Sequence, residues 1–538
     1  MGINLDDMGA KNARLIKEAL MIMRKHENYR YIIDSVMACE YFRINHPEMW
    51  EELQQRVKER KIELIGGDIV APDTLLPNGE SLVRQFLYGC RYFKKHFGID
   101  SKIAYLIDSF GQTPQLPQIL KKAGFEFFIF VRGARNRRLP QEFWWKSFDG
   151  SKILTHWMYS TYTYLPPPFA MTILPPIFPF FLIPGTLQVI PQNFKVYELL
   201  VKILPPFKYI FRRLSNTRLG ISIFGIDIGG LKFTIKNRIV RATSDNILIL
   251  YGTDNLPPST NILDAVDYYN KKNKENKTII ANPSEFHSAL KKSSKKFGVV
   301  ENYEFLGPPD LFPGTFSNRP KLKQQIRFLE NQFYLTELFS SLSQLFNNTA
   351  YPKEEIATAI KRILCCDFHD GITGVHIDAA YDNIIKQLKL SELQLKRLFK
   401  SALSYFIKNI DTSNILKEDI PILIFNPLSW ERTSIERINL PGKIKEFMIL
   451  NQNGKQIPHQ KEKTNEKKNS YIFLAKDIPS IGYASYSIRK NQSSNQEPSK
   501  LEQKKINTLT IENNLLKLNF KDGKLISIFN KKDKFELN

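Results

Sequence analysis

The sequence predicts a multi-domain chain that begins with an α/β domain and continues with a helical module and an all-β region. Short apolar strands alternate with helices up to about residue 310, long helices with apolar residues at helical spacing follow in 311–415, and short strands separated by turns fill 416–538. The chain is 538 residues long, which exceeds the size at which a single hydrophobic core stops growing. These three ranges are therefore the expected domains.

The α/β domain is predicted from strands and helices that follow one another at short intervals. The expected helices cover 10–24, 47–60, 80–97, 116–122 and 284–291. The expected strands cover 30–36, 61–65, 103–107, 125–131, 246–251 and 278–281, together with a strand, an Asp-Gly turn and a second strand over 142–156. This alternation indicates parallel βαβ units, which form either a barrel or an open sheet.

The other two regions are predicted from a change in periodicity. The expected helices cover 321–346, 353–364 and 375–407. The expected strands cover 422–425, 434–439, 447–450 and 471–474. Two further strands, 509–520 and 525–529, are expected to form a hairpin around Asp522-Gly523, because an Asp-Gly pair favours a tight turn.

The formal net charge of +23 raises the hypothesis of a nucleic-acid-binding protein. The lysines are, however, spread along the whole chain and mixed with acidic residues, and no helix-turn-helix, zinc-finger or RNA-binding motif accompanies them. Charge alone supports only non-specific binding. No nucleic-acid partner is therefore expected, and salt-dependent retention on DNA would test this.

The cysteines and the N-terminal residues indicate a reducing, cytoplasmic location. Cys39, Cys90, Cys365 and Cys366 form neither a Cys-x-x-Cys pair nor a disulfide framework. The first residues lack a basic segment followed by an apolar core, so no signal peptide is expected. The stretch 165–194 is apolar and uncharged but rich in proline, which would leave backbone groups unpaired in lipid. We expect an apolar loop or lid there, with its role left open, and no membrane partner.

Two carboxylates lie at or shortly after the carboxyl ends of expected strands. Asp108 comes after the strand 103–107 and opens the turn Asp108-Ser-Phe-Gly111, and Asp254 comes after the strand 246–251. Ligands bind at the carboxyl ends of strands in α/β domains, because the outgoing loops converge there. Both residues are therefore candidate catalytic groups, although an Asp in such a place also serves as a turn or N-cap residue.

A histidine and an aspartate lie side by side in the helical region, in the segment Cys365-Cys-Asp-Phe-His369-Asp370-Gly-Ile-Thr-Gly374. The glycines permit a tight loop that could reach across to a pocket. A single histidine is more often a surface or packing residue than a ligand. The pattern alone leaves the role of His369 open.

Taken together, the motifs of the chain resemble glycoside hydrolase family 38, the retaining α-mannosidases. The motifs that carry the resemblance occur in the family's order and are Pro72-Asp73, Leu76-Pro-Asn-Gly-Glu-Ser-Leu-Val-Arg-Gln85, Asp108-Ser-Phe-Gly111, Phe143-Trp-Trp145, Asp149-Gly-Ser151, Gly252-Thr-Asp254 and His369-Asp-Gly-Ile-Thr-Gly374. The segment Phe425-Asn-Pro-Leu-Ser-Trp430 resembles the first strand of that family's sandwich domain. The resemblance extends from about residue 30 to the end.

The resemblance implies a barrel-like α/β catalytic domain over 1–310, a three-helix module over 311–415 and the start of a β-sandwich-type domain over 416–538. It also implies a zinc ion, with Asp108 as nucleophile and zinc ligand and His369 as a second ligand. Asp254 would be the general acid/base, and Asp370 would contact sugar hydroxyls.

Two further assignments from the resemblance keep their alternatives. Arg132 could bind hydroxyls or orient Asp108, and a surface salt bridge is the competing interpretation. The family places a tyrosine near the nucleophile, and Tyr162 is taken as the candidate, although Tyr159 and Tyr164 are not distinguished from it.

The resemblance implies a mannose-containing oligosaccharide as the substrate, and the residue types suit glycoside hydrolysis with retention of configuration. A retaining glycosidase places two carboxyl groups about 5–5.5 Å apart, one to attack the anomeric carbon and one to protonate the leaving oxygen. Zinc accepts His and Asp ligands and, with an open position, can bind sugar hydroxyls as a Lewis acid.

The sequence also departs from the family. The family's first strand ends in a His-x-Asp motif that supplies two more zinc ligands, and neither His26, in a charged helical setting, nor Asp6 and Asp7 reproduce it. The family's Phe-Gly-His is Phe-Gly-Gln112 here. We expect an α-mannosidase truncated at both ends with an incomplete zinc site. The alternative is a catalytically inactive carbohydrate-binding homologue. The linkage cleaved is not indicated, and a homo-oligomer is left open.

Overall fold

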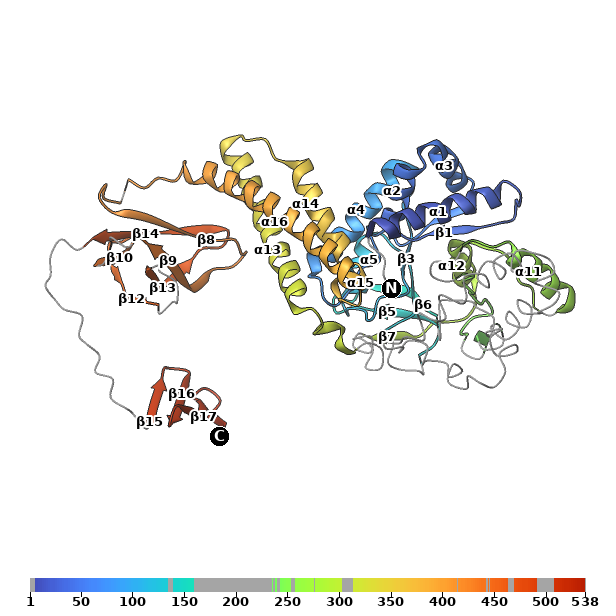
Figure 1. Ribbon diagram of the computed structural model, residues 1–538. Coiled ribbons are helices and arrows are strands. Elements are labelled where there is room, and N and C mark those ends of the chain that lie inside the picture. The colour runs from blue at the N-terminus through green and yellow to red at the C-terminus, as the bar shows by residue number, and fades with distance from the viewer. Residues whose placement is uncertain are drawn as a thin grey trace, which may run out of the picture. The chain divides into compact units, whose positions relative to one another are not determined.

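The computed structural model describes residues 5–133, 139–158, 235, 238–239, 242–252, 257–274, 276–301, 313–413, 415–441, 444, 446–462, 469–490 and 508–537. The chain divides into two compact units, Met1–Ile410 and Asp411–Asn538 (Figure 1). The separate α/β and helical domains expected within the first unit stay a prediction.

The strands of the first unit form two sheets. β1 (Tyr31–Ile33) and β2 (Ile62–Leu64) make a parallel pair, and the N–H of Gly66, just after β2, donates to the carbonyl of Ile103 at 2.9 Å. The second sheet has the order β3-β4-β6-β5-β7, with bounds Ile103–Leu106, Phe127–Phe130, Lys152–Trp157, Glu142–Lys146 and Val299–Glu301. β3, β4 and β6 run parallel, and β5 runs antiparallel to β6. Among the described residues both sheets are open, and closure into a barrel stays a prediction.

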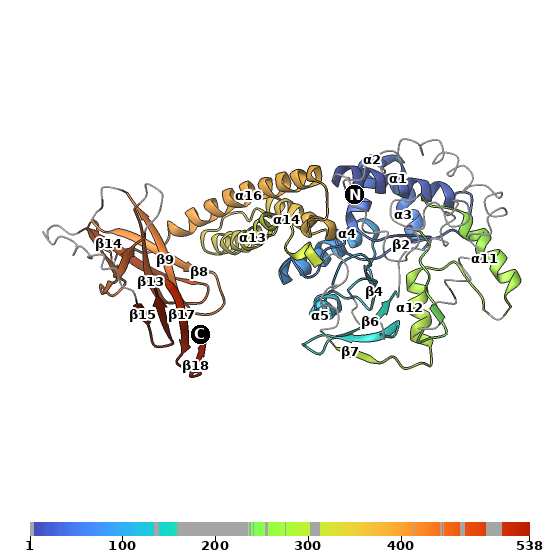
Figure 2. The same cartoon turned by 60° about the horizontal axis from the view of Figure 1, so that its bottom comes forward.

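Helices cover both faces of the five-stranded sheet, which explains why β3 and β4 are apolar at every position. Successive strand residues point to opposite faces. On one face Leu106, Phe130 and Trp145 pack against α4 (Gly79–Phe97) and α5 (Leu116–Lys122). On the other face Tyr105 and Ile129 pack against α12 (Pro283–Lys292). Figure 2 shows α5 and α12 on either side of β4 and β6.

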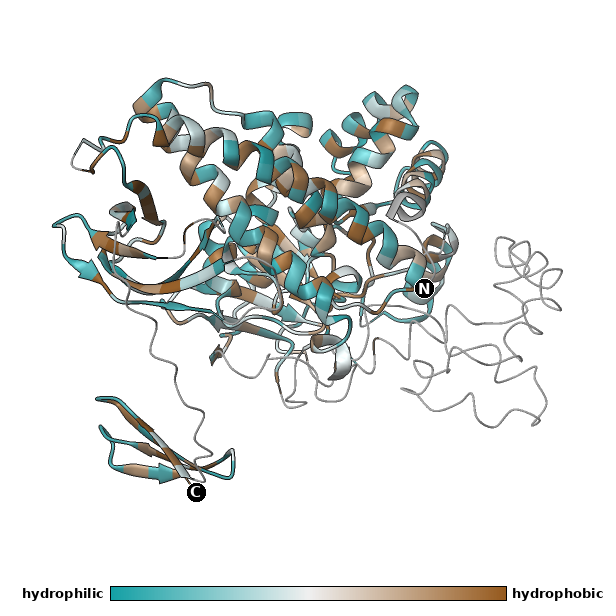
Figure 3. Cartoon of the chain, turned by 60° about the vertical axis from the view of Figure 1, so that its left-hand side comes forward, coloured by the Kyte–Doolittle hydropathy of each residue, from teal (hydrophilic) through white to brown (hydrophobic). Residues whose placement is uncertain are grey.

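A second core joins the N-terminal helices to the helical segment. The N-terminal elements are α1 (Leu5–Met23), α2 (Val36–Asn45), η1 (Pro47–Met49) and α3 (Trp50–Lys58). The later ones are α11 (Asn261–Lys272), η4 (Pro313–Phe316), α13 (Pro320–Asn347), α14 (Lys353–Cys366), α15 (His369–Ile372) and α16 (Asp378–Ile407). Phe42, Phe93, Phe333 and Leu388 belong to one buried cluster, so α2, α4, α13 and α16 share it. Figure 3 shows hydrophobic and hydrophilic residues alternating along the helices of the chain, as helices with one packed face require.

The second unit is all-β. Its sheets have the orders β11-β10-β14-β8, β12-β13-β9 and β15-β16-β17-β18. The bounds are β8 Ile420–Asn426, β9 Arg432–Leu440, β10 Phe447–Asn451, β11 Gln456–Ile457, β12 His459–Lys461, β13 Asn469–Ile478, β14 Gly482–Lys490, β15 Thr508–Glu512, β16 Leu516–Lys521, β17 Lys524–Asn530 and β18 Phe535–Leu537. Ile449, Phe473 and Ile488 lie in a common core of the first two sheets.

The structure corrects several expected elements. Residues 246–250 form no strand, because Leu248 and Leu250 pack on the sheet face without joining a ladder. The expected strand 278–281 is also irregular, and Ile279 is exposed. The strand expected over 30–36 ends at Ile33, since Val36 begins α2. The expected strand 509–520 is interrupted, so β15 and β16 form one hairpin and β16 and β17 a second.

Candidate active site

Asp108 lies just beyond the carboxyl end of β3, in a turn that is held from the loop after β2. The hydroxyl of Ser109 donates to the carbonyl of Pro72 at 2.7 Å, and the hydroxyl of Thr74 donates to the carbonyl of Gly111 at 2.8 Å. The next helix begins only at Leu116. Asp108 is therefore not a helix cap, and its carboxylate contacts side chains instead.

The first of these side chains is Arg132, whose Nε lies 2.6 Å from Oδ1 of Asp108. The parallel register explains the contact, because Leu106 of β3 pairs with Phe130 of β4 and each charged residue lies two positions further on. The guanidinium also lies 5.5 Å from the centroid of the Phe110 ring. Arg132 thus pairs with Asp108 at the carboxyl ends of these strands, and the Arg132 side chain is 15% exposed.

The second side chain is His369, in the one-turn helix α15. Its Nε2 lies 3.4 Å from Oδ2 of Asp108, and its Nδ1 lies 2.9 Å from the carbonyl of Ala71. A carbonyl only accepts, so Nδ1 carries a proton and Nε2 faces the carboxylate. Burial lowers the pKa of His369, but the bond to Asp108 and the nearby charge of Asp370 outweigh it and raise the pKa overall. The residue His369 is only 6% exposed.

A buried aspartate holds the two loops under the site together, and the sequence reasoning assigned it no role. Oδ1 of Asp73 accepts from the N–H groups of Leu75 and Leu76, both at 2.8 Å, and the N–H of Asp73 donates to the carbonyl of Asp367 at 2.9 Å. Burial raises the pKa of Asp73. The available signal was the Pro72-Asp73 pair before a turn-rich stretch, since Asp side chains bond their own following backbone.

The remaining candidate residues are less informative. Asp370 is half-buried beside His369, and its carbonyl accepts from Nδ1 of His376 at 2.7 Å. Asp254 and Tyr162 lie outside the described residues. The structure therefore brings together Asp108, Arg132 and His369, with Asp370 adjacent in the chain.

The donor types at the site fit part of a zinc site. A carboxylate oxygen and an imidazole Nε2 face each other, and the hydrogen bond from Nδ1 to a backbone carbonyl is the support that metal-binding histidines usually have. In the part of the chain that the structure describes, no group of three or more His, Cys, Asp or Glu side chains is arranged to hold a metal ion. The pair could thus supply two ligands and not a complete set.

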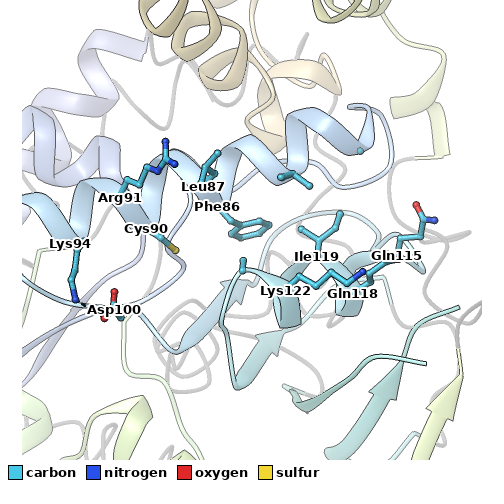
Figure 4. Close-up of a pocket in the computed structure, with 13 residues that line it drawn as sticks. Phe86, Leu87, Cys90, Arg91, Lys94, Asp100, Gln115, Gln118, Ile119 and Lys122 are labelled. Atoms are coloured by element: carbon cyan, nitrogen blue, oxygen red, sulfur yellow. Dashed lines mark hydrogen bonds and ion pairs between the residues drawn. The ribbon is translucent and has the colours of Figure 1, made fainter. Parts of the chain in front are cut away.

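A separate groove of about 690 Å³ lies between α4 and α5 (Figure 4). Phe86 and Ile119 contribute apolar lining, and Lys94 at the rim pairs with Asp100 at 2.7 Å. Neither Asp108 nor His369 is among its lining residues.

Among the described residues, no helix has both the length and the apolar character needed to cross a membrane.

A carboxylate, an imidazole and a guanidinium that meet at the carboxyl end of parallel strands form the kind of site that α/β enzymes use. Comparison with known protein families also identifies an enzyme family. The model of the glycosyl hydrolases family 38 N-terminal domain matches residues 4–305, and the model of the alpha mannosidase middle domain matches residues 310–406. The first match covers more than half of the chain, and the chain therefore belongs to glycosyl hydrolase family 38.

Individual relatives are similar at low identity. Alpha-mannosidase G of Dictyostelium discoideum is 24% identical over 414 residues, which cover 76% of this chain and 32% of that protein. Alpha-mannosidase 2C1 of Homo sapiens is 24% identical over 442 residues, which cover 80% of this chain and 36% of that protein. The chain thus spans about a third of the length of these relatives.

A solved structure shares the fold. An alpha-mannosidase from Enterococcus faecalis V583 superposes with a TM-score of 0.72 at 18% identity, over 99% of this chain and 59% of that chain. At this identity the likeness concerns the fold alone.

Proposed function

We propose that this chain carries the catalytic part of a retaining α-mannosidase that removes terminal α-mannosyl residues from oligosaccharides. Its membership of glycosyl hydrolase family 38 supports the reaction class. The single observation that supports the site is the contact of Asp108 with both Arg132 and His369, because three separate segments converge on one carboxylate.

In this proposal Asp108 is the nucleophile. Its carboxylate attacks the anomeric carbon and forms a glycosyl-enzyme ester, while Asp254 gives a proton to the leaving oxygen. Asp254 then accepts a proton from the water that hydrolyses the ester. Arg132, with Nε 2.6 Å from Oδ1, fixes the orientation of the attacking carboxylate. Asp370 and Tyr162 are proposed to hold the sugar hydroxyls.

The proposed metal is zinc, held by Asp108 and His369 together with ligands that are not among the described residues. When bound, zinc would act as a Lewis acid toward sugar hydroxyls. His369 is suited to this role because Ala71 fixes the proton on Nδ1 and leaves Nε2 directed at Oδ2 of Asp108.

An aryl α-mannoside assay with metal analysis tests the proposal. Asp108→Asn should lower kcat/KM by at least about a thousandfold, because the nucleophile is lost. His369→Ala should lower the bound zinc. Asp100→Asn is a matched control, since Asp100 pairs with Lys94 at the surface. Full activity of Asp108→Asn would show that the assignment is wrong. Binding of oligosaccharide without turnover at any zinc concentration would favour the alternative, a non-catalytic carbohydrate-binding homologue.

A further inference from the structure

A buried polar network lies on the face of the sheet that packs against α12. It joins Glu142 of β5, His156 of β6 and Thr243 of the irregular stretch 242–252. Glu142 and His156 are both 0% exposed, and Nδ1 of His156 lies 2.9 Å from Oε1 of Glu142. The proposed reaction uses none of these three residues, although a fully buried carboxylate is costly to maintain.

The charges in the network are balanced. Burial raises the pKa of Glu142, but the bonds from His156 and Thr243 outweigh it and lower the pKa overall. Burial lowers the pKa of His156 despite the neighbouring carboxylate, and Nδ1 of His156 donates to Oε1 of Glu142. The nearby guanidinium of Arg238 interacts with the charge of Glu142. Glu142 is thus a buried anion that can accept hydrogen bonds firmly.

Thr243 is bound to Glu142 through both its main chain and its side chain. Its N–H donates to Oε2 of Glu142 at 2.9 Å, and its hydroxyl donates to the same oxygen. The N–H of Glu142 lies 3.2 Å from Oγ1 of Thr243. A residue held at several atoms by a charged acceptor has little freedom to shift along the strand.

The stretch 242–252 forms no regular strand, so no ladder of main-chain hydrogen bonds fixes its position along the sheet. Leu248 and Leu250 pack on the sheet, and the stretch runs to Gly252, two positions before Asp254 in the sequence. In the parallel pairing of β4 with β6, His156 lies opposite Ile129, which precedes Arg132 by three residues. At about 3.3 Å per residue, the network lies about 10 Å below the edge that carries Asp108 and Arg132. It therefore supports the site from beneath.

We propose that Glu142 is a positioning residue, which holds Thr243 and thereby sets the register in which the stretch 242–252 delivers the chain to Asp254. This inference rests on the proposed function of Asp254 as the general acid/base. His156 keeps the carboxylate of Glu142 directed at Thr243, since its Nδ1–H occupies the other oxygen.

Hydrogen exchange on the full chain tests the structural step without any need for turnover. Glu142→Gln and Thr243→Val should each raise the exchange rate of amides in 242–252 by about tenfold, because a bond to a charged group is lost. Amides of β3 should not change. Thr155→Val is the control for the same substitution elsewhere, because Thr155 is fully buried on β6 and its hydroxyl donates to the carbonyl of Ile153. Exchange in 242–252 that rises no more than in Thr155→Val would overturn the proposal.

Leaving-group dependence tests the functional step. Asp254→Asn should slow the cleavage of an α-linked mannobiose far more than that of a dinitrophenyl α-mannoside, whose leaving group departs without a proton. Thr243→Val should shift the same ratio in the same direction by about tenfold. Thr243→Ser keeps the hydroxyl and should restore the wild-type ratio.

The outcomes separate the two proposals. If Asp254→Asn shows the leaving-group effect and Thr243→Val does not, the positioning role is overturned and the proposed function stands. If Asp254→Asn shows no such effect, the acid/base assignment is wrong and the positioning role fails with it. If Thr243→Val slows both substrates equally, a general loss of structure explains the result, and the positioning role is likewise overturned.

Discussion

His287 makes the first unit sensitive to acid. Its ring stacks on Phe127 of β4 with centroids 4.9 Å apart and an interplanar angle of 10°, and the residue is 6% exposed. Burial, with a smaller contribution from Lys291, lowers the pKa of His287 from 6.5 to about 4. The unfolded chain therefore binds a proton at a higher pH than the folded chain does.

The sign and size of the effect follow from these two pKa values. The folded state is unaffected above pH 6.5 and loses stability as the pH falls toward 4. The loss is about 2 kcal/mol at pH 5 and about 3 kcal/mol at pH 4. His287→Gln removes the titrating ring, so the variant should lose about 2 kcal/mol less than the wild type does between pH 7.5 and pH 5.

Urea unfolding at the two pH values measures this difference. Tryptophan fluorescence is a suitable signal, because Trp50, Trp144, Trp145 and Trp157 all lie in the first unit. His26→Gln, at an exposed position, controls for the removal of an imidazole as such. Equal acid dependence in wild type and His287→Gln, within about 0.5 kcal/mol, would refute the reasoning.

Two further predictions concern packing and capping. Gly89→Ala should destabilise the first unit by about 3 kcal/mol or abolish folding, because a Cβ there would lie 2.2 Å from the carbonyl oxygen of Gly67. Gly98→Ala, at a helix end with φ of 71° and no atom within 4 Å of a Cβ, should cost only about 1 kcal/mol. Thermal unfolding compares these two variants directly, and equal losses would contradict the clash. Asn426→Ala should cost the second unit about 2 kcal/mol, because buried Asn426 donates to the carbonyl of Trp430 at 2.7 Å and accepts from the N–H of Leu428 at 3.1 Å. Faster hydrogen exchange in β8 measures this loss, and unchanged exchange would contradict it.

Elements with a strong local signal could be predicted from the sequence. α13, α14 and α16 are present close to their expected bounds, because apolar residues recur at helical spacing over several turns. The turn between β16 and β17 is also confirmed, with φ of 49° at Asp522 and 76° at Gly523, since Asp-Gly tolerates two left-handed residues in succession. These features depend on neighbours in the chain.

Elements that depend on distant contacts could not be predicted. β7 has three residues and exists through its pairing with β5, and residues 246–250 have the apolar pattern of a strand but find no ladder to join. The same holds for the site. Strand-end position singled out Asp108, and the family resemblance alone suggested its pairing with His369. The roles of Ala71 and Thr243 depend on main-chain groups, which carry no signal in residue type.

The residues that meet at the site are synthesised at very different times. Ala71 and His369, whose carbonyl and ring meet there, are 298 residues apart. A ribosome that adds about 5–20 residues per second completes the second about 15–60 s after the first. The strands around Asp108 thus have time to fold before the imidazole has been synthesised. A nascent chain at that stage contains Asp108 but not yet His369. The site is therefore assembled only when the later helices have been synthesised and pack against the strands.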